Sequence, residues 1–198
     1  MANEYSTLTL LKSSLKITDT DRDALLNQAL TAASRGIDNF TGRRFWLDAT
    51  ATARVINPRG KVVYDTEGGH LLVDDIGSAA GLVVEVGRGS SWTVITSEVE
   101  AEPTDALDQG EPVTSLLRLY SRWQFATGQR VRVTAKWGWP AIPDVVAQAA
   151  LIQAGRLFKR KDSPEGILGN AEWGIVRLAR IDPDVQALVQ DLVLPGFG

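Results

Sequence analysis

The spacing of apolar residues changes twice along this chain, and this change constrains the fold more than any other feature. Residues 20–42 carry apolar side chains at steps of three and four, which is the spacing of one helical face. Residues 48–138 contain short β-rich runs separated by Gly and Pro, and helical spacing returns from Pro143. The sequence therefore predicts an α+β protein: a helical bundle of N- and C-terminal segments with an inserted antiparallel β barrel or sandwich.

The same pattern predicts three parts, which are a helical part at 1–47, a β-rich domain at 48–138, and a second helical part with a docking tail at 139–198. A chain of 198 residues is long enough to bury a sizeable core. Trp137 and Trp139 stand where the strand pattern gives way to Pro140, and we expect them to anchor the β-rich domain to the helices.

Two helices are predicted before the β-rich region. Thr7 is suited to cap a short helix that ends near Leu15, and Thr20 to cap a second helix that Gly42 closes. The apolar stripe of the second helix is Leu26, Leu30, Ala33, Ile37 and Phe40. A row of small residues beside this stripe would let another helix, of this chain or of a neighbouring subunit, approach closely. The candidate subunit-packing residues are Ala29, Ala32, Gly36 and, on the helix that follows Pro143, Ala149.

The β-rich region divides into short predicted strands. They are residues 53–56, 61–64, 70–73, 82–86, 92–95, 116–120 and 130–137. The last run alternates strictly between polar and apolar residues, as a strand with one buried face does. Residues 87–91 lie between two of these runs, which indicates a hairpin turn and not a phosphate-binding loop before a helix.

The C-terminal region is predicted to end in an apolar docking segment. After a break at residues 163–166, we expect a short strand at 174–181, and Asp182-Pro183 can start a last helix to about Leu192. Apolar residues at helical spacing, continued past the helix end, suit a groove on a partner protein. The candidate partner-binding residues are Val185, Leu188, Leu192, Leu194 and Phe197.

Composition excludes several classes of function. The chain has no cysteine, which removes disulfides, thiolate nucleophiles and Cys-based zinc sites and fits a reducing cytoplasm. The formal net charge of −3 disfavours tight non-specific binding to DNA. The N-terminus lacks the pattern of a signal peptide, and no apolar run approaches the ~20 residues that cross a bilayer. We therefore expect no membrane association.

No residue pattern points to catalysis, a cofactor or a metal ion. Ser13 and Lys16 have the spacing of a hydrolase motif without its companion motifs, and His70 is the single histidine. Asp74-Asp75 are expected in a turn, and Glu98, Glu100 and Glu102 along a solvated edge. We expect no catalytic, cofactor-binding or metal-binding residue.

Arg43 and Arg44 have two possible roles. They follow the second predicted helix, where cations complement the helix dipole, and this role is favoured by the acidic balance of the chain. The alternative is that they face DNA phosphates.

Three stretches together resemble the head-to-tail adaptor family of tailed bacteriophages, also called connector or head-completion proteins. The first comprises Leu11-Lys12, Ile17-Thr18-Asp19, Asp23-Ala24-Leu25-Leu26, Ile37-Asp38 and Phe40-Thr41-Gly42-Arg43-Arg44. The second is Trp137-Gly138-Trp139-Pro140-Ala141-Ile142-Pro143 with Leu157-Phe158 and Ser163-Pro164-Glu165-Gly166, and the third is Asp182-Pro183-Asp184-Val185 with Leu188. Together these stretches span nearly the whole chain, and their order and separation are what the resemblance depends on.

The resemblance implies a structural protein of the virion and no enzyme. The implied assembly is a ring of identical copies, expected to be dodecameric, that docks on the portal protein and extends the DNA channel toward the tail. The expected partners are the portal protein, neighbouring copies, a further neck or tail protein, and DNA that passes without specific binding. The protein would assemble in the host cytoplasm and then lie in the virion neck.

A different class of function remains open from the residues alone. The β-rich domain could be an enzyme or a carbohydrate-binding module whose surface aromatic residues, Trp92, Tyr120 and Trp123, contact the ligand.

Overall fold

The structure, a computed structural model, describes residues 3–123, 128–160 and 182–194. The chain divides into two compact units. The helical unit comprises the residues up to Arg43 and those from Ile142 onward, and the β unit comprises Arg44–Ala141. These units are defined by compactness, and the predicted domains 1–47, 48–138 and 139–198 stay a prediction.

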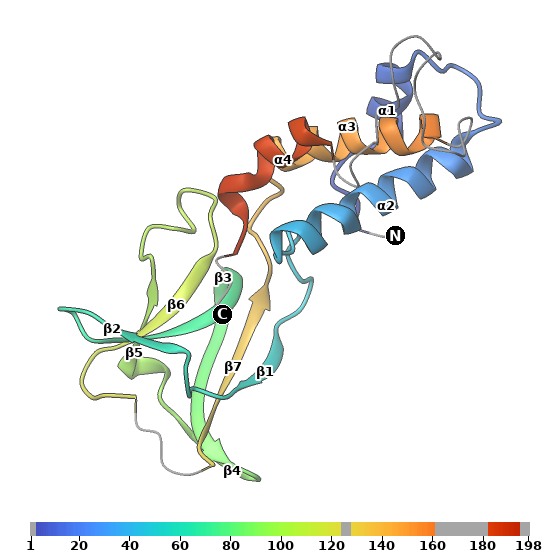
Figure 1. Cartoon of the computed structure of the whole chain (residues 1–198). Helices are drawn as coiled ribbons and strands as arrows, with labels where there is room; N and C mark the ends of the chain where they lie inside the picture. The colour runs from blue at the N-terminus through green and yellow to red at the C-terminus, as the bar shows by residue number, and fades with distance from the viewer. Residues whose placement is uncertain (1–2, 124–127, 161–181, 195–198) are drawn as a thin grey trace. The chain divides into compact units, whose positions relative to one another are not determined.

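The helical unit packs its N-terminal helices against its C-terminal ones (Figure 1). Its helices are α1 (Leu8–Leu15), α2 (Asp23–Thr41), α3 (Asp144–Arg160) and α4 (Pro183–Val189), which continues as the 3-10 helix η2 (Gln190–Leu192). Helix α2 packs on α3, α1 contacts both, and α4 packs on α3. Across the described ranges, every helix is too short or too polar to traverse a lipid bilayer. The predicted strand at 174–181 lies outside the described residues.

The helix ends follow local capping chemistry, with one exception. The Thr7 side chain accepts a hydrogen bond from the Leu10 N–H, and Gly42 closes α2 at φ +69°, as predicted. Thr20 was the wrong cap for α2. The helix begins at Asp23, and Thr20 instead accepts the Asp23 N–H through its backbone carbonyl. The sequence 19–22 thus forms a turn before the helix.

The predicted stripe of α2 forms the core of the helical unit. Leu26, Leu30, Ala33 and Ile37 are buried, while Phe40 is half-buried. Helix α1 adds Leu11 to this cluster, and α3 adds Ala154 and Phe158. The core therefore joins segments from the two ends of the sequence.

The β unit is one open antiparallel sheet, so the mixed α+β class is confirmed and the barrel alternative is wrong. Its strands are β1 (Thr52–Ile56), β2 (Val62–Tyr64), β3 (Gly69–Arg88), β4 (Ser91–Val94), β5 (Val99–Glu102), β6 (Val113–Arg118) and β7 (Arg130–Trp137), with the 3-10 helix η1 (Thr96–Glu98) before β5. The strand order is β1-β7-β3-β6-β5, and β2 and β4 also pair with β3. The path ends at β1 and β5, which do not pair with each other.

Strand β3 replaces two of the predicted strands. Residues 70–73 and 82–86 belong to one 20-residue strand, and Asp74-Asp75 lie within it and not in a turn. Residues 69–76 pair with β2 and β6, and residues 76–88 pair with β7 and, at the end of the strand, with β4. Register shifts at residues 72–83 let the strand change partners without ending.

Strand β7 agrees with its predicted alternation. Val131, Val133, Ala135 and Trp137 are buried, while the residues between them are half-buried. These side chains share one apolar cluster with residues of β3 and β6, including Leu71, Val84 and Leu116. Both halves of β3 therefore contribute to the same core.

The ends of the β unit lie side by side. The Asp48 N–H donates to the Trp137 carbonyl at 2.9 Å, and the Gly138 N–H donates to the Asp75 carbonyl at 2.8 Å. Gly138 has φ +107°, and a Cβ there would lie 1.8 Å from the Trp46 carbonyl oxygen. Only glycine fits this approach.

Trp139 is buried where the chain leaves the sheet. Its ring packs on that of Phe45, with centroids 5.1 Å apart, and its Nε1 donates to the Asp75 carboxylate at 3.0 Å. These contacts lie inside the β unit. The predicted anchoring of the β-rich domain to the helices by Trp137 and Trp139 stays a prediction.

A fragment of residues 44–141 is expected to fold without the helices, because its core is closed within the β unit. Its amide resonances should be dispersed in a two-dimensional NMR spectrum. A shorter fragment, 48–136, lacks Phe45, Trp137 and Trp139 and should unfold at lower temperature. A collapsed spectrum of the longer fragment would mean that the sheet needs the helices.

The substitution Trp139→Ala should lower the free energy of unfolding by about 3 kcal/mol, because it leaves a cavity beside Phe45 and removes the hydrogen bond from the indole to Asp75. The control Trp139→Phe keeps an aromatic ring beside Phe45 but loses the hydrogen bond and part of the buried ring volume, so we expect a smaller loss than for alanine. Urea denaturation measures both. Equal stabilities for wild type and Trp139→Ala would contradict the burial of this ring.

Candidate functional site

The hydroxyl and imidazole candidates have ordinary structural surroundings. Ser13 lies on the exposed side of α1, and Lys16 follows the helix in a left-handed conformation at φ +56°. His70 Nε2 lies 3.0 Å from the Asp65 carboxylate. The backbone N–H groups of Glu67 and Gly68, more than His70, hold the pKa of Asp65 below its usual value.

Two of the carboxylates that were considered for a metal or for catalysis are paired with arginines. Asp74 pairs with Arg54 at 2.6 Å, and Glu98 pairs with Arg118 at 2.9 Å. Within residues 3–123, 128–160 and 182–194, no three His, Asp or Glu side chains gather in a way that would hold a metal ion.

Arg132 and Glu85 form an ion pair with two hydrogen bonds. Two guanidinium nitrogens donate to the two carboxylate oxygens at 2.5 and 2.6 Å, and these bonds keep the pKa of Glu85 below its usual value. The guanidinium also lies over the Trp92 ring, 4.4 Å from its centroid. One face of the Trp92 ring is thereby covered by a side chain of β7.

The aromatic residues proposed for a carbohydrate site do not form a common surface. Trp123 is buried, and its Nε1 donates to the Gly69 carbonyl at 2.9 Å. Tyr120 is 81 % exposed, whereas Trp92 lies under Arg132. A sugar-binding platform needs exposed ring faces, so this geometry gives the alternative function no support.

The candidate subunit-packing residues separate into two groups. Ala29 and Ala149 are buried within their own chain, and Ala29 belongs to the core that joins α1, α2 and α3. Ala32 is exposed and Gly36 is half-buried, with open space where a Cβ would stand. Of the four predicted subunit-packing residues, only Ala32 and Gly36 thus have accessible surface.

The docking segment is partly used by the chain itself. Asp182 caps α4 as predicted, and it accepts the Asp184 N–H at 2.9 Å. Val185 is fully buried in its own helical unit, so it offers no surface to a partner, contrary to the expectation for this residue. This burial follows from the packing of α4 on α3.

The rest of the docking segment is more accessible. Leu188 and Leu192 are half-buried, and Leu194 is 43 % exposed. The Leu194 N–H donates to the Thr41 carbonyl at 2.8 Å, which fixes the segment to the end of α2. Phe197 lies outside the described residues.

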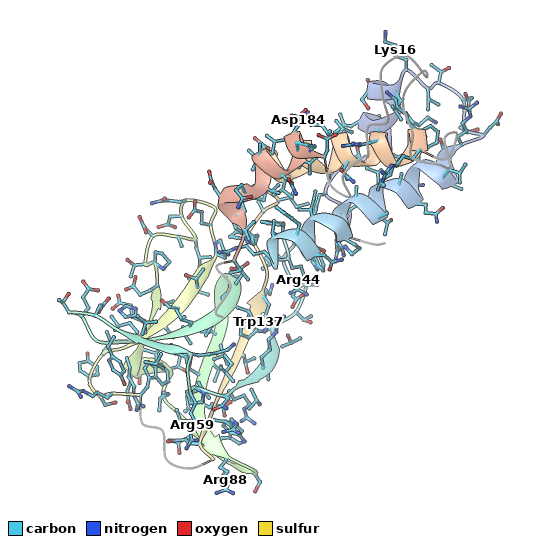
Figure 2. The ribbon with its side chains drawn as sticks, in the orientation of Figure 1. Lys16, Arg44, Arg59, Arg88, Trp137 and Asp184 are labelled. Atoms are coloured by element: carbon cyan, nitrogen blue, oxygen red, sulfur yellow. The ribbon has the colours of Figure 1, made fainter. Side chains whose placement is uncertain are left out.

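Arg44 is held by its own neighbours. Its guanidinium lies 2.9 Å from Asp48 and 4.8 Å from the centroid of the Trp46 ring (labelled Arg44 in Figure 2). Arg43 is half-buried, and its N–H donates to the Thr41 hydroxyl at 3.2 Å. A phosphate would have to compete with Asp48 for Arg44, so the predicted DNA-facing role of Arg43 and Arg44 gains no support here.

The comparisons with known proteins extend these observations. Residues 5–68 match the family model of phage gp6-like head-tail connector proteins. No curated protein sequence matches the chain. The matched residues comprise α1, α2 and the chain that follows them into β2.

The whole fold is similar to two structures from gene transfer agent (GTA) particles. One chain, from a neck of an empty GTA particle computed with C6 symmetry, superposes with a TM-score of 0.56 at 17% sequence identity, covering 100% of this chain and 98% of that one. A second, from the virion of a native GTA particle, superposes with a TM-score of 0.52 at 15% identity, covering 99% and 97%. With the family match over residues 5–68, the predicted resemblance to head-tail connector proteins is confirmed.

Proposed function

We propose that this protein is a phage head-to-tail adaptor, a structural ring subunit that docks on the portal protein and extends the DNA channel toward the tail. The observation that carries the proposal is the agreement of two independent comparisons. The helical pair matches the connector family in sequence, and the complete chain, β unit included, has the fold of a chain from a GTA particle neck.

A ring is supported by the symmetry of that neck. A cyclic ring uses two different patches on each subunit, one for each neighbour. The exposed side of α2 around Ala32 and Gly36 is one such patch, because small residues let a neighbouring backbone approach closely. We propose twelve copies for the ring.

Docking on the portal is proposed for the C-terminal segment. Leu188, Leu192, Leu194 and Phe197 supply apolar side chains, while the buried Val185 holds α4 against α3. A short apolar segment laid in a partner's groove is a common mode of recognition. A further neck or tail protein would bind the opposite side of the ring, DNA would pass without specific binding, and the protein would move from the host cytoplasm to the virion neck.

A structural role also fits the state of the polar side chains. Asp74, Glu85 and Glu98 are each paired with an arginine and are therefore not free to act as an acid or a base. We therefore propose that function resides in surfaces and that the protein is not an enzyme.

Mixing the protein with its portal protein should give a complex that contains a ring of adaptor subunits, with a mass that corresponds to about twelve copies. Mass photometry or analytical ultracentrifugation of each protein alone and of the mixture measures this. Two species that sediment independently at micromolar concentration would contradict the proposal.

Removal of residues 195–198 should leave the melting temperature unchanged and weaken association with the portal, because Leu194 and its bond to Thr41 are retained. In the comparison variant Leu194→Ser, the apolar side chain beside Gly42 is lost. This variant should weaken association with the portal and also lower the melting temperature slightly. Portal binding at full strength after the truncation would place the docking surface elsewhere.

A further inference from the structure

Three turns of the β unit meet at the end where β7 begins. Arg130 pairs with Gly87, and the neighbouring Val131 pairs with both Val86 of β3 and Ile56 of β1. The β3–β4 turn at residues 88–91 and the β1–β2 turn at 57–61 must therefore leave the sheet at the same end. Figure 2 shows Arg59 and Arg88 at this end, away from Trp137.

Each of these turns carries an arginine and none carries a carboxylate. The sequences are Asn57-Pro58-Arg59-Gly60-Lys61, Arg88-Gly89-Ser90-Ser91 and Gly128-Gln129-Arg130. The Arg88 guanidinium lies against the Gly128 turn, since a Cβ on Gly128 would be 3.0 Å from its Cζ. We call Arg59, Arg88 and Arg130 the arginine end.

The arginine end is uncompensated by ion pairs. The nearest carboxylate along β3 is that of Glu85, and both of its oxygens are taken by Arg132. In the described part of the chain, Arg59 and Arg88 have no carboxylate within ion-pair distance, and Arg130 donates to the Gln129 carbonyl. Their positive charge is therefore available to an outside anion.

Negative charge gathers at the other end of the same sheet. Ile76 pairs with both Trp137 and Val113, so the segment before Val113 lies at the far end of β7 from Arg130. That segment, residues 102–111, contains the carboxylates of Glu102, Asp105, Asp108 and Glu111. The eight residues of β7 separate the two ends by about 23 Å at ~3.3 Å per residue.

We propose that the arginine end is a phosphate-contacting surface for duplex DNA, in place of Arg43 and Arg44. A guanidinium matches a phosphate in charge and geometry, and arginines on turns can reach a nucleic-acid backbone without reading its bases. Two of the turns also have open space around them, since a Cβ on Gly60 or Gly89 would meet nothing within 4 Å. The sugar-phosphate backbone of DNA can therefore approach these turns. The inference rests on the proposed function, because the cyclic symmetry of a ring would repeat these arginines around the DNA channel.

The arginine end is expected to bind DNA phosphates weakly and not with high affinity. Three phosphate contacts in one chain contribute about 2.7 to the slope of log K against log salt, at about 0.9 for each contact. Such binding weakens steeply between ~50 mM and ~200 mM salt. A local row of arginines is thereby compatible with a chain whose net charge is −3.

The test compares two triple variants of the full chain with the same net charge. The first is Arg59→Gln, Arg88→Gln and Arg130→Gln, and the second is Lys16→Gln, Arg22→Gln and Arg122→Gln, three exposed cations at other places. Each variant lacks three cations and so changes the net charge from −3 to −6. Binding of a fluorescent 20-base-pair duplex is measured by anisotropy across a salt series, together with melting temperature and association with the portal.

The first variant should bind the duplex at least about 10-fold more weakly at ~50 mM salt and lose about 2.7 from the salt slope, while the second stays near wild type. Equal losses in both variants, or no loss in the first, would overturn the inference. It would also be overturned if the first variant kept DNA binding and lost portal association or self-association, because the arginines would then dock a protein. Failure of the wild type to associate with the portal would contradict the proposed function and leave the DNA comparison unaffected.

Discussion

The β unit depends on strand β3, which pairs with four other strands. Residues near its start bond to β2 and β6, and residues near its end bond to β4 and β7. A flat strand of 20 residues could not serve both groups and bury a common core. The shifts in register at residues 72–83 provide the bend, and Gly77, where a Cβ would lie 2.7 Å from the Gly138 carbonyl oxygen, permits the close approach of the chain that leaves β7.

The sequence predicts the elements whose signals are local. The cap at Thr7, the closing Gly42, the hairpin at residues 87–91 and the alternation of β7 depend on neighbours a few positions away, and all of them are confirmed. The mixed α+β class follows from the same periodicities. Such signals are set by backbone geometry and side-chain spacing, which a sequence displays directly.

The features that the sequence misses depend on contacts between distant segments. Gly and Asp near residues 74–81 look like chain breaks, yet pairing with β6 and β7 keeps β3 continuous. The glutamates of β5 suggest a solvated segment and not a strand. The segment is nevertheless a strand, because it lies at the edge of the sheet and pairs with β6 alone. Val185 has the spacing of a docking residue but is buried by α3, which no local pattern reveals. For the same reason the arginine end emerges only when the register brings three separate turns together.

The hydrogen bond between Asp48 and Trp137 has a consequence for synthesis of the chain on the ribosome. Helices α1 and α2 emerge first, but α3, on which they pack, follows only after roughly 100 residues. If the intervening sheet folds first, its two ends are already adjacent, and the loop to be closed shrinks about tenfold. By the logarithmic cost of loop closure, this lowers the entropic barrier to docking of α3 by about 2 kcal/mol. The nascent chain would then gain its sheet before its bundle, so the packed surface of α2 and α3 would form only after the sheet is in place.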